Sequence, residues 1–428
     1  MGRAFKDSKI RSKLLFTFFV IVLSRVGSQI PLPGLDRSYL QNWFNSNVFS
    51  GGFNIISAFT GGSFERMSIF ALNITPYITS SIIIQLLTIV IPSLEELTKD
   101  GKEGEKKIKK ITIYLAIALA IVESLAMVIG FGKSGLLSGN KIVSGILIIV
   151  LMTAGTGFLI FLGEKVDKKG IGNGISIILL ANIISRLPND IVVLMQTFVL
   201  RKTIAKGVLA FVIIVAVIVA IIAFTVVLNE SVRRIPIIYA QTRGTAGQGI
   251  KQKSFLPIKV NTSSVIPIIF ASSLFSIPQI ISSVVGIKSN FILNCLNQNC
   301  WFNFRTPQYT LGFLIYVLLV VFFAYFYTSI TMNPVELADN LKKQNASIPG
   351  VRAGKPTEDY IRKILNRVII IGVTGLIIVV SIPMILNGVF NTSVSMGGTS
   401  LIIVVGVILE TVEVLDSEMA VHSYKSLL

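Results

Sequence analysis

The sequence predicts an all-α polytopic membrane protein, and three observations support this fold class. Of the 428 residues, 52% are hydrophobic and only 14% are charged, with a mean hydropathy of +0.76. This balance excludes both disorder and an ordinary soluble domain. The apolar residues gather in stretches of the length that crosses a bilayer, about 20 residues. Finally, Lys and Arg concentrate in alternate connecting segments, as the positive-inside rule requires.

Ten apolar stretches are long enough to cross the membrane, at residues 14–33, 67–92, 111–131, 142–162, 173–187, 207–228, 262–286, 311–332, 367–389 and 398–416. The first follows a basic start but continues to Pro31 without a small-residue cleavage site, so we expect a retained span. Connections on the side of the N-terminus hold 27 Lys or Arg residues, whereas those on the other side hold 9. We therefore expect both termini in the cytoplasm.

The second stretch is too polar for a helix that only lipid surrounds. It opens with Asn73, Thr75 and Pro76 and holds Gln85 near its middle, and unsatisfied polar groups cost free energy in hydrocarbon. The apolar piece before it, residues 53–59, is too short to span and suits a re-entrant segment. Together they suggest a short segment that blocks a pore, next to a helix that forms one side of a gate.

The chain divides into two halves of five spans each, residues 1–206 and 207–428. The second span begins Asn73-Ile74-Thr75-Pro76, and the seventh begins Asn261-Thr262 with Ile266-Pro267 shortly after. Because five is odd, two related halves must be inverted in the membrane, an arrangement that builds a pathway at their interface. Asn and Pro also occur at the start of many unrelated membrane helices. This motif alone therefore does not distinguish a repeat from chance similarity.

Two loops on the cytoplasmic side are longer than the topology requires. Residues 229–261 carry six Lys or Arg residues against one acid, Glu230, and residues 333–366 carry six more basic residues. Charges that only enforce topology explain this count but not the loop length. We interpret both loops as ordered, projecting, basic docking surfaces.

The second loop shows local order. Asn333-Pro334 stops a helix, a short helix follows from Val335 to Gln344, and a turn at Pro349-Gly350 presents Arg352. Thr357 is then expected to cap the helix that runs into the ninth span.

Few residues suit intramembrane chemistry. The one histidine, His422, lies in the tail, which excludes a histidine-based metal site or a Ser-His-Asp triad within the membrane. Glu123 in the third span has no obvious basic partner, so the sequence does not favour an ion-coupled transporter. An intramembrane protease also lacks its required residues. Cys295 and Cys300, on the outer side, are either bridged or incidental thiols.

Aliphatic pairs at helical spacing are a further feature. Ile78 and Ile82 lie four residues apart in the second span, as do Ile175 and Leu179 in the fifth, so each pair shares one helix face. Branched aliphatic side chains from several helices can close a pore by dewetting. Such spacing is more often plain helix packing, and it does not assign a role by itself.

Five long stretches resemble the SecY/Sec61-alpha family. They are NITPYITSSIIIQLL, LGEKVDKKGIGNGISI, LPIKVNTSSVIPIIFASS, ADNLKKQNASIPGVRAG and GGTSLIIVVGVILE, and they follow the expected order over essentially the whole chain. The resemblance implies ten transmembrane helices in two inverted five-helix halves around a central hourglass pore. It also implies a channel, not an enzyme, that passes unfolded polypeptides and releases hydrophobic segments laterally into lipid.

The resemblance assigns four groups of residues. The pore ring comprises Ile78, Ile82, Ile175, Leu179, Ile269 and Ile403, where the family usually has isoleucine in place of Leu179. The plug covers about residues 53–66 and includes Phe53, Ile55, Ile56 and Phe59. The lateral gate, between the second and seventh spans, includes Gln85, Ser272 and Ser273. The cytoplasmic docking residues are Arg243, Lys251 and Arg352.

The partners implied by the resemblance are the small membrane subunits SecE and SecG, the motor ATPase SecA, the ribosome, signal sequences, unfolded preproteins and membrane lipid. The implied location is the plasma membrane, and no metal or cofactor is implied. A motor or ribosome would push the chain into the pore, displace the plug and leave the ring to fit around the chain. Which of the two partners dominates stays open.

Overall fold

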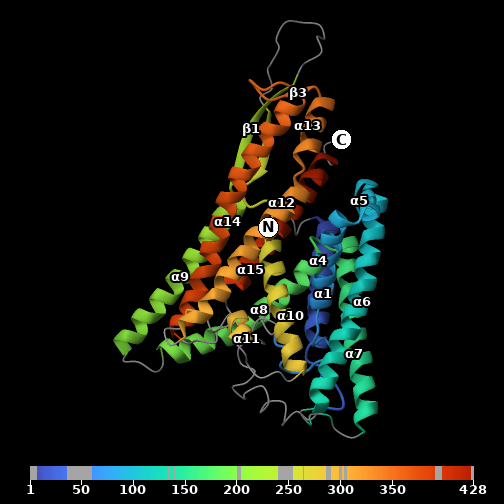
Figure 1. Ribbon diagram of the computed structural model, residues 1–428, viewed down its shortest axis with the longest axis vertical. Helices are drawn as coiled ribbons and strands as arrows, with labels where there is room; N and C mark the ends of the chain where they lie inside the picture. Colours follow the sequence, from blue (N-terminus) through green and yellow to red (C-terminus); the bar gives the residue numbers. More distant parts are fainter. Residues whose placement is uncertain are drawn as a thin grey trace.

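Ten long helices form the frame of the described chain, and each overlaps one predicted apolar stretch (Figure 1). The computed structural model describes residues 7–35, 60–133, 135, 137, 140–199, 204–239, 254–263, 265–285, 291–297, 301–302, 306–390 and 398–425. The long helices are α1 (Ser8–Gly27), α4 (Thr75–Val90), α6 (Gly101–Lys133), α7 (Lys141–Lys169), α8 (Gly174–Leu194), α9 (Ile204–Glu230), α10 (Ile266–Val285), α12 (Leu311–Thr331), α14 (Lys355–Phe390) and α15 (Gly398–Lys425). The predicted helical fold class is confirmed.

The membrane character of these helices is also clear. Among the described residues, six helical segments are long and apolar enough to cross a bilayer. A seventh candidate is the pair of α4 and α5 (Pro92–Lys99), which is bent by 106°. The count of ten spans therefore stays a prediction, although every predicted stretch carries a helix.

The second span begins later than the sequence predicts. Residues 61–74 form turns and bends, and α4 is helical only from Thr75. Asn73 adopts a positive φ of 53°, and its side-chain oxygen accepts a hydrogen bond from the Ile74 N–H at 2.8 Å. Asparagine tolerates this left-handed conformation better than most residues. Pro76 then fits the first turn of α4, where a missing N–H leaves no helical hydrogen bond unmade.

The helices before and after residue 200 contact one another along two seams. At the first seam, α8 packs on α15. At the second, α10 packs on both α4 and α6. Between α8 and α9 lies a short π-helix, η1 (Met195–Val199), which contacts both. The division of the chain into halves at residues 206 and 207 stays a prediction, and these seams are where such halves would meet.

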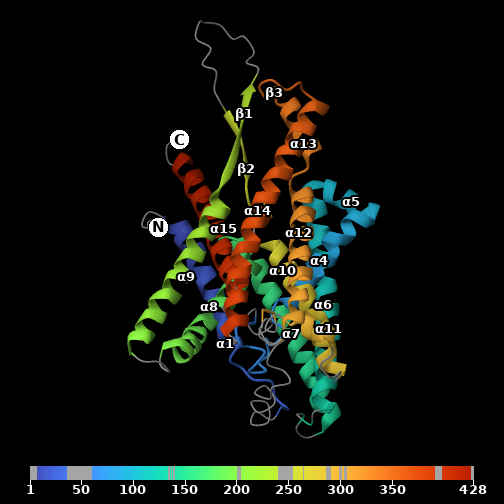
Figure 2. The ribbon, with the colours of Figure 1, turned by 60° about the vertical axis from the view of Figure 1, so that its left-hand side comes forward.

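A small domain projects from one end of the bundle (Figure 2). Its β-strands are β1 (Val232–Tyr239), β2 (Ser254–Lys259) and β3 (Ala346–Ser347), in the antiparallel order β2-β1-β3. The all-α prediction missed this sheet, which joins the two predicted docking loops. The short predicted helix is present as α13 (Pro334–Lys343), and Asn333 caps it by accepting a hydrogen bond from the Val335 N–H at 3.1 Å.

The projecting domain, which we define as β1–β3, α13 and the first turns of α14, has its own apolar core. This core comprises Ile235, Ile237, Ile258, Leu341, Ala346, Ile348, Ile361, Leu365 and Val368. With 36 residues, α14 is roughly 54 Å long, whereas the hydrocarbon core of a bilayer is about 30 Å thick. One helix can therefore cross the membrane and still support the sheet beyond it.

The start of α1 and the end of α15 lie together at the same end of the bundle as this domain (Figure 1). Ile10, Ile171 and Leu415 form a buried cluster there, and Lys13 Nζ pairs with Glu418 Oε1 at 2.5 Å. Two further short elements, α11 (Phe291–Leu296) and the 3-10 helix η3 (Pro307–Thr310), connect α10 to α12.

Candidate functional site

All six predicted ring residues belong to or pack against one large hydrophobic cluster, which extends from Val20 of α1 to Val407 of α15. Ile82, Leu179 and Ile403 are buried within it, with 4%, 3% and 0% of their surface exposed. Ile78, Ile175 and Ile269 are partly buried and pack against it. The six come from four helices, α4, α8, α10 and α15, which meet across both seams.

Ile175 owes its position to a close approach of two backbones. A Cβ added to Gly174 would lie 2.1 Å from the Gly163 carbonyl oxygen, and one added to Gly163 would lie 2.7 Å from Ile175 Cδ1. The backbone contact at Gly174 requires glycine there for the start of α8 to rest on α7, whereas a larger residue at Gly163 would displace the Ile175 side chain. Asn173 caps α8 by accepting hydrogen bonds from the N–H groups of Ile175 (3.1 Å) and Ser176 (3.2 Å).

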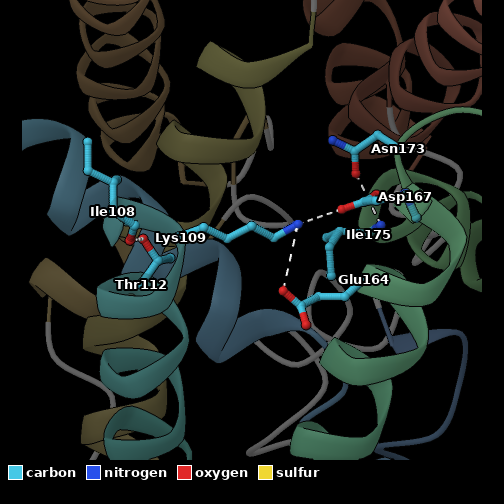
Figure 3. A network of polar contacts seen from close by, with 8 residues as sticks. Ile108, Lys109, Thr112, Glu164, Asp167, Asn173 and Ile175 are labelled. Carbon is cyan, nitrogen blue, oxygen red and sulfur yellow. Dashed lines mark hydrogen bonds and ion pairs between the residues drawn. The ribbon is translucent and has the colours of Figure 1, made fainter. Parts of the chain in front are cut away.

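An ion-pair network holds this junction to α6 (Figure 3). Lys109 of α6 reaches across to α7, where its Nζ lies 2.6 Å from Asp167 Oδ2 and 3.9 Å from Glu164 Oε1. The other oxygen of Asp167 accepts a hydrogen bond from the Gly174 N–H at 2.8 Å. Asp167 therefore connects α6, α7 and the first residue of α8, directly before a ring residue.

The four named plug residues, Phe53, Ile55, Ile56 and Phe59, lie outside the described residues. The end of the predicted plug, residues 60–66, is described, and two arginines hold it. Arg25 of α1 donates from Nη1 to Asn182 Oδ1 at 3.0 Å and from Nη2 to the Gly61 carbonyl at 3.4 Å. Arg186 of α8 pairs with Glu65 at 2.7 Å.

Neither arginine belongs to a motif that predicts a role for it. Their position within or at the end of apolar stretches was the available signal, because a charge placed there needs a partner. Arg25 and Arg186 meet that need with groups from the plug end and from α8.

The gate residues lie on the helices of the second seam. Gln85 of α4 donates to Ser81 Oγ at 3.4 Å, but its Oε1 is buried and has no hydrogen-bond partner among the described residues. Ser272 and Ser273 of α10 are both buried. Ser272 Oγ lies 3.2 Å from the Tyr316 hydroxyl of α12, so it also joins α10 to its neighbour within the second half.

Of the predicted docking residues, the structure describes one. Arg243 and Lys251 lie outside the described residues, whereas Arg352 is exposed, two residues after the left-handed Gly350 (φ 79°). Thr357 does not cap α14 as predicted, because the helix already begins at Lys355. Instead, Thr357 is buried in the first turn and its hydroxyl donates to the Arg352 carbonyl at 2.8 Å. This hydrogen bond stabilises the segment that carries Arg352.

These features define a class of protein: a polytopic helical membrane protein with an aliphatic cluster where its two sets of helices meet. A family model described as SecY matches residues 68–412. The chain belongs to the SecY family.

Relatives and solved structures agree with this membership. The Protein translocase subunit SecY of Staphylococcus aureus is 37% identical over 432 residues, covering 98% of this chain and 97% of its own. That of Streptomyces galbus is 38% identical, covering 100% and 99%. The fold matches a structure described as a protein conducting channel, with a TM-score of 0.67 and 20% identity over 96% and 93% of the two chains.

It also matches Sec61 in the canine ribosome-channel complex from the endoplasmic reticulum. That match has a TM-score of 0.64 and 19% identity, covering 96% of this chain and 92% of that one. At these identities the two structural matches show the fold.

Proposed function

We propose that this chain is a protein-conducting channel of the membrane, which passes unfolded polypeptides across and releases hydrophobic segments sideways into lipid. One observation carries the proposal: the six aliphatic side chains, from four helices, all belong to or pack against the large hydrophobic cluster shared by the helices of both seams. Such a ring excludes water at rest, and its side chains separate around a passing chain. Leucine has the volume of isoleucine, so Leu179 serves the seal equally well.

The plug end supports the same mechanism. Residues 60–66 are fixed to α1 and α8 by Arg25 and Arg186, which anchors the end of the plug segment. A translocating chain then displaces the plug while this tether keeps it close enough to return. Nothing in this mechanism requires the chain to catalyse a reaction.

The projecting domain is the proposed docking surface, and it includes the exposed Arg352. Other exposed cations of this domain are Arg233, Arg234, Lys342, Lys343 and Lys355, and lysine and arginine bind RNA phosphate. The ribosome and the motor ATPase SecA are the proposed partners there, and SecE and SecG are the proposed partners in the membrane. The Sec61 and Ssh1 structures that share this fold are ribosome complexes. With this domain in the cytoplasm of a bacterial cell, both termini are cytoplasmic too.

The seam between α10 and α4 is the proposed lateral gate. A hydrophobic segment in the pore leaves through it because burial of apolar surface in lipid stabilises the segment by about 25 cal/mol per Å². Gln85 lies on α4, one of the two helices of this seam, and its buried Oε1 has no hydrogen-bond partner among the described residues, which leaves a polar group that the closed state does not satisfy.

The ring assignment is tested by resting ion conductance in planar bilayers. Replacing Ile82, Ile269 and Ile403 together with serine is expected to raise the resting leak, because three hydroxyls allow the constriction to hydrate. The matched control replaces Ile89, Leu274 and Ile408 with serine, since these lie on the same three helices with exposed side chains. An unchanged leak in the ring variant, or an equal leak in the control, would contradict the assignment.

A further inference from the structure

Three aromatic residues join α10 to α12 through the connecting segment between them. Phe275 belongs to α10, Tyr316 to α12, and Trp301 to the connection. All three are buried, and Trp301 is fully enclosed. We call Phe275, Trp301 and Tyr316 the aromatic clasp.

The clasp is a closed triangle of ring contacts. Ring centroids are 5.8 Å apart for Phe275 and Trp301, 5.5 Å for Phe275 and Tyr316, and 5.6 Å for Trp301 and Tyr316. The two contacts of Phe275 are edge-to-face, with interplanar angles of 89° and 86°. Aromatic pairs favour this geometry because ring edges are positive and ring faces negative.

Polar contacts fix the rings in place. Trp301 Nε1 donates to the Cys295 carbonyl of α11 at 2.7 Å. A Cβ added to Gly312 would lie 1.7 Å from that same carbonyl oxygen, so α12 begins directly against α11. The Tyr316 hydroxyl lies 3.2 Å from Ser272 Oγ on α10. Cys300 lies outside the described residues.

The clasp contacts α10 next to the position where the helix lacks a backbone hydrogen bond. Pro278, three residues beyond Phe275, lies inside α10 and removes one hydrogen bond of the helix. Ser272 and Phe275 lie just before this proline. A helix with a proline bends there unless its neighbours restrain it, and the clasp provides that restraint on the α12 side.

We propose that the aromatic clasp makes α10 and α12 move as one unit and thereby sets how hydrophobic a segment must be to leave through the lateral gate. This inference rests on the proposed function, in which α10 separates from α4. With the clasp intact, α10 cannot part from α4 without carrying α12 along. Without it, α10 bends away alone, the gate opens more readily, and less hydrophobic segments reach the lipid. Trp301 is therefore a positioning residue of the gate.

The test uses the full chain in proteoliposomes with its translocation partners and a series of precursors. Each precursor carries a central test segment of alanine with an increasing number of leucines, and the readout is the ratio of inserted to translocated product. In Trp301→Ala, this ratio at the wild-type midpoint is expected to rise by at least roughly 2- to 10-fold, the range for losing one of the two ring contacts that Trp301 makes within the clasp. Trp301→Phe, which keeps an aromatic ring, is expected to restore part of the wild-type ratio.

The matched control is Phe291→Ala. Phe291 is an exposed aromatic residue of α11 whose ring contacts Tyr309 of the same connection at 5.8 Å. Its replacement is expected to leave the ratio at the wild-type value. An unchanged or lowered ratio in Trp301→Ala, or an equal rise in Phe291→Ala, overturns the proposal.

Two further measurements separate the possible causes. A general loss of folded channel lowers insertion and translocation together and leaves their ratio in place. If Trp301→Ala does not fold, Tyr316→Phe is the deciding variant, because it keeps the ring but removes the hydroxyl beside Ser272. The ratio of inserted to translocated product must then rise above the wild-type value in Tyr316→Phe. A wild-type protein that translocates no precursor at all refutes the proposed function instead.

Discussion

A methyl group at Gly174 tests how tightly the pore ring depends on the junction of α7 and α8. The Cβ of Gly174→Ala would lie 2.1 Å from the Gly163 carbonyl oxygen, 2.7 Å from its carbon and 2.8 Å from its Cα. These atoms belong to the backbone of α7, so no side-chain rotation relieves the overlap. The start of α8 must move away from α7 by about 1 Å to restore ordinary contact distances.

The size of the effect follows from two opposing terms. Overpacking of this kind costs about 1–3 kcal/mol, whereas replacing glycine with alanine in a helix contributes about 0.5–1 kcal/mol of stability. The expected net loss is about 0.5–2 kcal/mol. Because Ile175 follows directly, the same movement shifts it within the ring, and the resting ion leak should rise.

The assay pairs thermal unfolding in detergent with resting conductance in planar bilayers. Gly157→Ala is the control, since Gly157 lies on α7 and a Cβ there meets nothing within 4 Å. The control should keep or slightly raise the unfolding midpoint and leave the conductance unchanged. If Gly174→Ala behaves like Gly157→Ala in both measurements, the backbone contact does not position Ile175, and the reasoning fails.

Two other predictions concern charged residues. Asp167→Asn should lower the free energy of unfolding in detergent by about 1–3 kcal/mol, whereas Lys109→Met should lower it by less than about 1 kcal/mol. The reason is that Asp167 pairs with Lys109 and also accepts a hydrogen bond from the Gly174 N–H. Equal losses in the two variants would contradict this prediction. Arg352→Glu should reduce secretion of an unfolded precursor by about tenfold or more while leaving the unfolding midpoint unchanged. Lys141→Glu, at an exposed residue at the start of α7 and outside the projecting domain, should secrete normally, and full secretion by Arg352→Glu would refute the docking role.

Helix positions were predictable because hydropathy over about 20 residues is a local property. The sheet was not, because β1 completes its core with Leu341 and Ile348, about a hundred residues away, and each of the two longer strands contains a proline (Pro236 and Pro257). The alternating burial of Ile235 and Ile237 on β1, and of Leu256 and Ile258 on β2, reflects the strand period.

The ring residues illustrate the limit of sequence patterns. Spacing placed Ile78 with Ile82 and Ile175 with Leu179 on shared faces, but it gave no means of joining α4 to α8, α10 and α15. The family motifs proposed that set, and the structure places all six residues in one cluster. The aromatic clasp was not predictable, because Trp301 lies in a connection outside the family motifs.

The two seams between the halves differ in what opening would expose, and this difference selects the gate. Separation of α8 from α15 would expose the buried cluster of Ile10, Ile171 and Leu415. The two halves are also connected beside this seam, because η1 contacts both α8 and α9, and α9 packs on α15. At the second seam, the buried Gln85 oxygen of α4 has no hydrogen-bond partner among the described residues, and water that entered on opening would donate to it and offset part of the cost. We therefore expect the first seam to act as the hinge and the second to open.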